Sequence, residues 1–148
     1  MAAPQSFVPQ RPSRSKVVRR FTLAEANSTL PLVKRIVGDI VKTHAKAKDL
    51  RKHLQALDAK SIQQPGAQQQ QKDLERSVEQ LQEFISELTA VGAELKDFDT
   101  GLIDFVGRHD GRDVYLCWKL GEDSIAYWHE LDAGFAGRKP VSTLKEGK

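Results

Sequence analysis

The sequence has little of what marks an oxidised or membrane-spanning protein. Its 148 residues include one cysteine, and no apolar run approaches the roughly 20 residues that a membrane-spanning helix needs. A single cysteine cannot form a disulfide within the chain, so nothing requires an oxidising compartment. Residues 1–20 also lack the apolar segment of a secretory signal. We therefore expect a cytoplasmic protein that does not associate with membranes.

The positive charge is unevenly distributed. The formal net charge is +3, but residues 1–20 hold five basic and no acidic residues, whereas the remaining 128 residues hold 18 basic and 20 acidic ones. Because this excess belongs to a segment rich in Pro, Ser, Gln and Arg, we predict a disordered basic tail over residues 1–20. Nucleic-acid association through the tail is one functional alternative, and the rest of the chain gives no reason to expect it.

A long helix is predicted after this tail. Thr22 and Glu25 have the spacing of a capping box, in which each side chain accepts a hydrogen bond from the backbone of the other residue. Apolar residues then recur in alternating steps of three and four, which is the heptad pattern of helices that pack side by side. Pro31 interrupts the pattern and predicts a kink, or a short helix before a long one. The helical segment spans about residues 22–60.

A second helix follows a polar stretch. Pro65 and Gly66, with the glutamines around them, predict a linker over residues 61–72. Heptad spacing resumes near residue 73 and ends before Gly92, a typical helix stop. The two helices, about 22–60 and 73–91, would then form an antiparallel hairpin in which each buries its apolar stripe against the other.

Beyond Gly92 the hydrophobic period changes to the alternation of strands. Three strands are predicted, over Leu102–Val106, Val114–Lys119 and Ser124–Glu130. Asp110-Gly111 suits a type I′ turn between the first two, and Gly121-Glu122 suits a type II′ turn between the last two. The predicted fold is therefore α+β: a long antiparallel heptad helical hairpin followed by a small three-stranded antiparallel sheet over 102–130. We expect one domain over 21–141 and a tail over 142–148.

These turns set a register that divides the sheet into two faces. The face predicted to pack on the hairpin carries Trp118, Tyr127 and His129. The opposite, outward face is half polar and carries Asp104, Tyr115, Cys117 and Trp128. Another part of the chain, a partner or a ligand is expected to cover it. A three-residue turn at 121–123 would instead slip the last strand by one residue and exchange its two faces.

Several motifs resemble those of a known family. They are Asp97-x-Asp99-Thr100-Gly101-Leu102-x-Asp104-Phe105, Tyr115-Leu116-Cys117-Trp118-x-Leu120-Gly121-Glu122, Trp128-His129, Gly134-Phe135-Ala136-Gly137-Arg138 and the upstream Phe21-Thr22-Leu23-x-Glu25-Ala26-Asn27. Together they resemble the bacterial domain-of-unknown-function family 2203 over about residues 21–141. Val106 stands where members often have proline. The resemblance implies a small soluble bacterial protein folded as one unit, and it implies no mechanism.

Familiar catalytic patterns are matched only in part. Cys117 and His129 have the residue types of a nucleophile and its base, with Asp104 as an orienting group. The predicted register puts Cys117 and His129 on opposite faces, so we interpret Cys117 as a small buried apolar residue. One cysteine and scattered histidines lack the paired spacing of zinc ligands. No catalytic residue, metal site or cofactor is predicted.

The Gly134–Arg138 loop is the strongest binding candidate. Gly134 and Gly137 permit close approach to the backbone, and Arg138 suits a phosphate or carboxylate group. The structural alternative is that Phe135 closes the edge of the core while Arg138 pairs with an internal carboxylate.

Two further hypotheses follow, and neither assigns an enzymatic step. The first is a non-enzymatic interaction or scaffold module that contacts a protein partner through its sheet, or a second copy through the heptad helices or the sheet. The alternative is a small-molecule or anion-binding protein, with an unrecognised enzyme as a variant of it. The candidate binding residues for both are Asp104, Tyr115, Cys117, Trp128, His129, Gly134, Phe135, Gly137 and Arg138.

Overall fold

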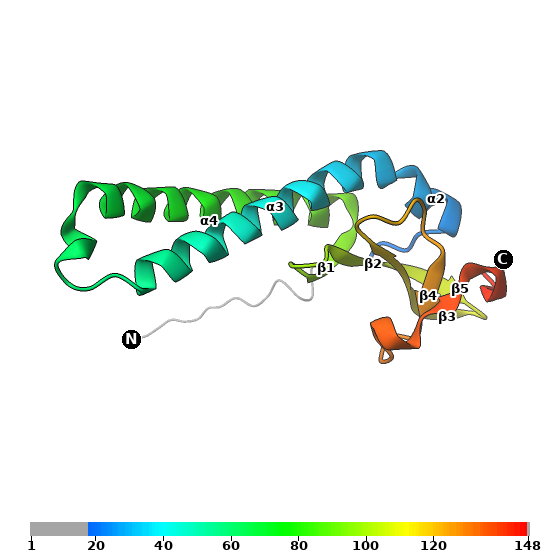
Figure 1. Ribbon diagram of the computed structural model, residues 1–148. Coiled ribbons are helices and arrows are strands. Elements are labelled where there is room, and N and C mark those ends of the chain that lie inside the picture. The colour runs from blue at the N-terminus through cyan, green and yellow to red at the C-terminus, as the bar shows by residue number, and fades with distance from the viewer. Residues whose placement is uncertain (1–17, 148) are drawn as a thin grey trace, which may run out of the picture.

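The computed structural model describes residues 18–147 as an elongated molecule, with a helical hairpin at one end and a β-sheet at the other (Figure 1). The helices are α2 (Leu23–Ser28), α3 (Leu30–Gln55) and α4 (Pro65–Val91), with short 3-10 turns η2 (Ser61–Gln63), η3 (Phe135–Gly137) and η4 (Val141–Thr143). The strands are β1 (Ala93–Asp97), β2 (Leu102–His109), β3 (Arg112–Lys119), β4 (Tyr127–His129) and β5 (Lys139–Pro140). The predicted α+β class, with the hairpin before the sheet, is confirmed.

The first helix begins and ends as its sequence predicts. The Thr22 side chain accepts a hydrogen bond from the Glu25 amide at 3.0 Å, and the Glu25 carboxylate accepts one from the Thr22 amide at 2.9 Å, which completes the capping box. The expected break at Pro31 is also present, because α2 ends at Ser28 and α3 starts at Leu30. Proline is tolerated there because the first amides of a helix have no partner within it.

The prediction for the start of α4 is wrong. This helix begins at Pro65 and not near residue 73, so most of the predicted linker is helical. Pro65 lies in its first turn, where the missing N–H and the fixed φ of proline are compatible with a helix. Its other end agrees with expectation: Gly92 terminates it with a φ of 116°.

The core lies where the sheet meets the hairpin. Val33, Val37 and Ile40 of α3 are fully buried, as is Leu88 of α4. They pack with the inner face of the sheet, which contributes Ile103, Phe105, Val114, Leu116 and Trp118. Farther along the hairpin the two helices pack only on each other (Figure 1). The sheet therefore covers one end of the hairpin and leaves the rest as an extended helical arm.

The sheet is larger than predicted. Within residues 18–147 it has five strands in the order β1-β2-β3-β4-β5, and the neighbouring strands are antiparallel. The predicted pairing of β2 with β3 is confirmed, since Asp104 is opposite Cys117 and Phe105 is opposite Leu116. Asp110 and Gly111 have φ values of 49° and 81° in the turn between them, as a type I′ turn requires.

The predicted pairing of β3 with β4 is wrong by one residue. Tyr115 is opposite His129, and Cys117 is opposite Tyr127. The cause is the turn after β3, in which the Glu122 amide donates to the Lys119 carbonyl at 3.0 Å. Gly121, with a φ of 105°, is therefore the third residue of the turn, as in a type II turn, and not the second residue of a type II′ turn. As a result, Trp128 faces the core, while Tyr127 and His129 face outward.

Both ends of the described chain pack on the sheet. The Phe21 amide donates to the Val106 carbonyl at 2.8 Å, and the Lys145 amide donates to Nδ1 of His109 at 2.9 Å. The Leu144 side chain packs against the core, within the segment predicted as a C-terminal tail. Of the predicted basic tail, residues 1–17 lie outside the described part of the chain.

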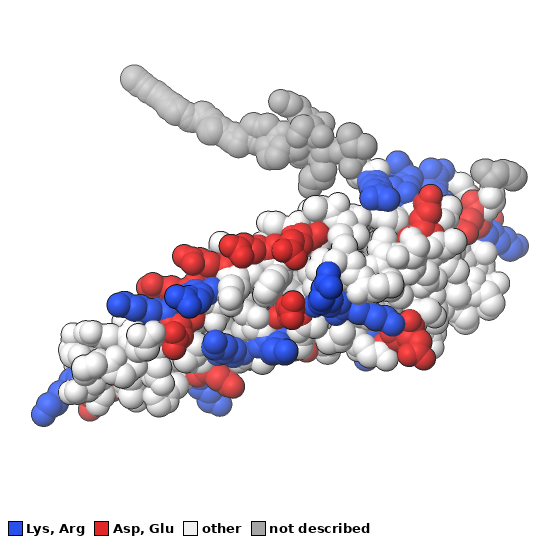
Figure 2. Space-filling view, turned by 90° about the horizontal axis from the view of Figure 1, so that it is seen from above, with Lys and Arg blue, Asp and Glu red and all other residues white. Residues whose placement is uncertain are grey.

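The surface of the hairpin is highly charged. Along α4, exposed glutamates recur at every fourth position, at Glu75, Glu79, Glu83 and Glu87. Figure 2 shows acidic side chains in a row along the hairpin, with basic side chains nearby. None of the helices in the described residues is both long and apolar enough to cross a membrane.

Substitutions at two glycines can test how closely the sheet packs on α3. A Cβ at Gly101 would lie 2.8 Å from Val37 and 2.9 Å from Leu120, whereas a Cβ at Gly111 would meet nothing within 4 Å. Both glycines have positive φ, which costs another residue about 1–2 kcal/mol. We expect Gly101→Ala to lower the free energy of unfolding by about 1–3 kcal/mol more than Gly111→Ala does, because it also overpacks the core. Urea denaturation of both variants measures the difference, and equal losses would contradict the predicted crowding.

Candidate functional site

The outward face of the sheet brings together three residues from three adjacent strands. Asp104 of β2, Cys117 of β3 and His129 of β4 each place a side-chain O, S or N atom within 4.8 Å of the others. This corrects the prediction that Cys117 and His129 lie on opposite faces. The one-residue difference in the register of β4 produces the cluster, because it turns His129 outward and Trp128 inward.

His129 is held at both ring nitrogens. Its Nδ1 lies 2.8 Å from the carbonyl oxygen of Glu130, and its Nε2 lies 3.2 Å from Oδ1 of Asp104. A carbonyl oxygen only accepts, so Nδ1 carries the proton of that hydrogen bond. Nε2 of the neutral ring then has a lone pair that points toward Asp104. The His129 and Asp104 side chains are only 3% and 4% exposed, so this contact is shielded from water.

Burial governs the protonation of the other two members of the cluster. It raises the pKa of Asp104 above its usual value, although the neighbouring His129 and a hydrogen bond with Cys117 act in the opposite direction. Burial, reinforced by the Asp104 carboxylate, raises the pKa of the Cys117 thiol to about 12. The thiol is therefore protonated at neutral pH, which does not suit a nucleophile that must act as a thiolate. The interpretation of Cys117 as a buried strand residue agrees with this chemistry.

The chain itself covers part of the outward face. After β4 the segment 130–138 crosses back over the sheet through η3, and Arg138 anchors its far end. The Arg138 guanidinium makes two hydrogen bonds to the Glu122 carboxylate, at 2.8 and 2.9 Å, and one to the Cys117 carbonyl at 3.4 Å. Its Cζ lies 4.2 Å from the ring centroid of Tyr127 and 4.6 Å from that of Phe135. The predicted pairing of Arg138 with an internal carboxylate is present, and the partner is Glu122.

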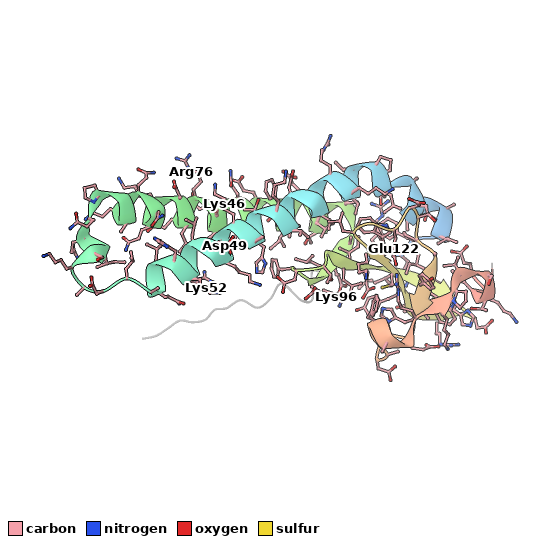
Figure 3. The ribbon with its side chains drawn as sticks, viewed as in Figure 1. Lys46, Asp49, Lys52, Arg76, Lys96 and Glu122 are labelled. Atoms are coloured by element: carbon pink, nitrogen blue, oxygen red, sulfur yellow. The ribbon has the colours of Figure 1, made fainter. Side chains whose placement is uncertain are left out.

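Glu122 is an ordered acceptor for this arginine. Burial acts to raise its pKa, but hydrogen bonds from Arg138 and from the Lys119 amide outweigh burial and hold the pKa below the usual glutamate value. The carboxylate is thus ionised at neutral pH and forms a charge-assisted, bidentate pair. Figure 3 places Glu122 at the sheet end of the molecule, far from the labelled charges of the hairpin, such as Asp49 and Arg76.

A pocket of about 150 Å³ lies between the sheet and the covering segment. Asp104, Tyr115 and His129, together with Lys96 and Leu102, line it on the sheet side. Leu131, Gly134 and Phe135 line it on the other side. A second pocket of about 250 Å³ shares Leu102 and Phe135 with the first and also contacts Lys119. A wider, open depression lies on α4, lined by Glu79, Gln82, Glu83 and Ser86, away from the cluster.

Lys96 brings positive charge to the pocket. Its ammonium lies 4.7 Å above the Tyr115 ring centroid and 2.9 Å from the Glu94 carboxylate. Burial acts to lower the pKa of Lys96, but the contacts with Glu94 outweigh it and leave the pKa above its usual value. Lys96 therefore remains charged.

Apart from Trp128, the predicted site residues lie in three places. Asp104, Tyr115, His129, Gly134 and Phe135 line the pocket. Cys117 lies in the cluster beneath it, whereas Gly137 and Arg138 belong to the anchored end of the covering segment.

Trp128 does not belong to the outward face. It is 2% exposed in the core, stacks on His109 at 4.3 Å and donates its indole N–H to Thr143 at 2.9 Å. The sequence analysis missed Lys96, because β1 was not predicted, and Glu122, because its turn was misplaced. An alternating Ala93-Glu94-Leu95-Lys96 pattern directly after Gly92 is the signal that points to β1.

Comparison with known proteins identifies one relationship. A family described as "Uncharacterized conserved protein (DUF2203)" matches residues 19–141, which include the hairpin, the sheet and the covering segment. No curated protein and no solved structure matches the chain.

The Arg138–Glu122 pair predicts a defined stability change. The Arg138 and Glu122 side chains are only 11% and 23% exposed. We therefore expect Arg138→Met to lower the free energy of unfolding by about 1–3 kcal/mol, a loss between those typical of surface ion pairs and of buried ion pairs. Because the folded-state pKa of Glu122 is lowered, its contribution is fully present above the unfolded-state pKa, about 4.3, and is lost as pH falls through the lower folded-state value. Glu122→Gln should remove this part of the pH dependence.

A double-mutant cycle in urea at neutral pH measures the coupling between the two side chains. Arg112, which pairs with Glu130 on the more exposed edge, supplies the control variant Arg112→Met, and we expect it to lower the free energy of unfolding less than Arg138→Met does, because solvent screens an exposed pair. Additive effects of Arg138→Met and Glu122→Gln would contradict the pairing.

Proposed function

We propose that this chain, which belongs to the DUF2203 family of uncharacterized conserved proteins, binds a small organic acid. The ligand would occupy the pocket between the outward face of the sheet and segment 130–138. The observation that carries the proposal is the convergence of Lys96, Asp104 and His129 on one pocket whose other walls are mainly apolar.

The walls suit the body of such a ligand. Leu102 and Tyr115 on the sheet side, with Leu131 and Phe135 on the other, offer aliphatic and aromatic surface. Each of the two adjoining pockets is smaller than the roughly 300–1,000 Å³ typical of drug-sized ligands. The expected ligand is therefore small, with a body no larger than a short alkyl chain or one aromatic ring.

The charges suit the acid group. Lys96 stays protonated and lies at the pocket. The Lys119 ammonium lies 5.3 Å from the Phe135 ring centroid, at the adjoining pocket. A carboxylate between these ammonium groups gains a charge-assisted interaction with Lys96 in a partly buried environment. His129, which lines the same pocket, gives this end of the ligand a second polar neighbour.

Arg138 has a positioning role in this proposal. Both ends of its guanidinium are engaged by Glu122, and Tyr127 and Phe135 flank it, so it is held within the covering segment. The segment would thus be fixed at Arg138, while the exposed side chains of Leu131 and Phe135 border the pocket entrance.

A second candidate function is contact with another protein chain through the same end of the sheet. Tyr127, Leu131 and Phe135 are 37%, 52% and 44% exposed, and they lie close together in the covering segment and β4. Exposed apolar residues that cluster are typical of protein contact surfaces. A second copy of the chain is the partner that this candidate commits to, because most soluble oligomers are symmetric assemblies of one kind of chain.

Ligand binding can be tested with acetate, butyrate and benzoate, each titrated into the ¹⁵N-labelled protein and followed by amide chemical shifts. We expect benzoate to bind most tightly, with a Kd on the order of 1 mM, and to shift amides of β1–β4 and segment 130–138. Benzamide, which has the same shape without the charge, should bind at least about fivefold more weakly. Lys96→Met should weaken benzoate binding until its affinity matches that of benzamide.

Lys48→Met is the matched control, because Lys48 is a partly exposed lysine that pairs with Asp99 on the hairpin side of the molecule. It should leave benzoate binding unchanged. No shift of pocket amides with any of the three acids, or the same affinity in Lys96→Met as in the wild type, would reject the proposal.

Self-association is tested by sedimentation over a range of protein concentrations. The second candidate predicts a dimer that Leu131→Asp converts to a monomer, while Leu32→Asp, at an exposed leucine of α3, has no effect. A wild-type protein that remains monomeric at high concentration would exclude a second copy as the partner.

A further inference from the structure

We propose that Asp104, Cys117 and His129 form a site for one divalent transition ion of the zinc type, at the base of the pocket. The donor set is a carboxylate oxygen, a thiolate sulfur and an imidazole nitrogen, all of which zinc accepts in proteins. Asp104 and Cys117 are paired across β2 and β3, and His129 lies on the same face of the neighbouring strand β4, opposite Tyr115, so a hydrogen-bonded part of the sheet brings the three together.

The orientation of His129 is that of a metal ligand. The Nδ1–H of His129 donates to the Glu130 carbonyl, which leaves the Nε2 lone pair directed at the cluster. Ligating histidines in proteins commonly hold their second nitrogen in this way, because the hydrogen bond fixes the tautomer and the ring orientation. The Glu130 carbonyl is a backbone group, so this orientation is independent of side-chain rotamers elsewhere.

The spacing of the donors also fits. For a tetrahedral ion about 2.0–2.2 Å from each N and O ligand, two such ligands are separated by about 3.3–3.5 Å. The Nε2 atom of His129 and Oδ1 of Asp104 lie 3.2 Å apart, and the Cys117 sulfur lies within 4.8 Å of both. Small side-chain rotations would therefore bring all three donors to bonding distance of one ion.

A cation would also resolve the electrostatics of the cluster. Asp104, Cys117 and His129 are 3%, 0% and 3% exposed, so their polar atoms are shielded from water. A bound dication would compensate the negative charge of a carboxylate and a thiolate buried in this way. On binding, the S–H bond of Cys117 breaks, the sulfur keeps the electron pair and bonds to the ion, and the proton leaves to solvent.

Three protein ligands leave a fourth position on a tetrahedral ion. Zinc sites of this kind take water or a substrate at that position. Asp104 and His129 both line the pocket as well as the cluster, so the open position would face the pocket. This step rests on the proposed function: the carboxylate of the organic acid would occupy the fourth position, with Lys96 beside it.

Cobalt(II) is the probe for the ion alone. The full-length chain without a tag, stripped by a chelator and kept reduced by a phosphine, would be titrated with cobalt chloride and followed by absorption. We expect saturation at one equivalent, with a strong near-ultraviolet thiolate-to-cobalt band and the visible bands of a tetrahedral site, and zinc should displace both. Because the chain has a single cysteine, this thiolate band can arise only from Cys117.

Three variants test the three ligands, and a fourth serves as the control. Cys117→Ser should abolish the band, and Asp104→Asn and His129→Gln should each weaken cobalt binding by at least about 10-fold, with circular dichroism to verify the fold. His44→Gln is the matched control, since Nδ1 of His44 lies 3.4 Å from the Asp99 carboxylate in another histidine–carboxylate pair, and it should bind as the wild type does. If any of the three cluster variants fails to fold, the thiolate band of the wild type still decides.

No thiolate band in the wild type at one equivalent, or a band that survives in Cys117→Ser, would overturn the metal site. The acid-binding proposal fails separately, because its titrations use metal-free protein and Lys96→Met, which keeps all three cluster residues. If both proposals hold, benzoate should alter the visible cobalt bands, and acid binding by the metal-free protein should tighten when zinc is added.

Discussion

The carboxylate of Glu122 connects the parts of the molecule that create the site. The carboxylate accepts a hydrogen bond from the Lys119 amide at 2.9 Å, which fixes the turn after β3. The backbone carbonyl of Glu122 accepts one from the indole N–H of Trp118, in the core, at 2.9 Å. The same carboxylate holds Arg138, and with it the far end of the covering segment. The turn sets the register of β4, and that register decides whether His129 or Trp128 faces Asp104. One residue, through its side chain and its backbone carbonyl, therefore links the core, the cluster and the cover of the pocket.

The division of the sheet into two layers follows from this register. The inner layer is apolar and packs on α3 and α4, where the hydrophobic effect stabilises it. The outer layer buries polar groups, which costs free energy unless each has a partner. Segment 130–138 contributes the Glu130 carbonyl, which accepts the Nδ1–H of His129, and the contact at Nε2 comes from Asp104 within the cluster. The outer layer therefore contains a buried Asp–His contact and a buried thiol, and the stability of the fold alone does not account for them.

Local signals predicted the parts of the fold that depend on local interactions. The capping box of Thr22 and Glu25, the break at Pro31 and the Asp110-Gly111 turn each involve residues close in sequence, and all three are present. The Gly121 turn was misplaced because glycine suits two positions in two turn types, and residue types alone do not reveal the Lys119–Glu122 hydrogen bonds that hold the observed turn. The Asp104–Cys117–His129 cluster was rejected for the same reason, since a one-residue error in a strand moves every side chain to the other face. The start of α4 was missed because Pro65 was interpreted as a helix breaker, although it also begins helices.

The positions of the two tryptophans determine what optical measurements can detect. Trp118 and Trp128 are 0% and 2% exposed and lie in the inner layer, separated from the pocket by the backbone of the sheet. Their fluorescence therefore reports the integrity of the core and not events on the opposite side. Tyr115, by contrast, lines the pocket, and its ring centroid is 5.5 Å from that of His129. The protein thus carries one set of chromophores for folding and a separate one for occupancy, which allows the two processes to be followed independently in the unlabelled chain.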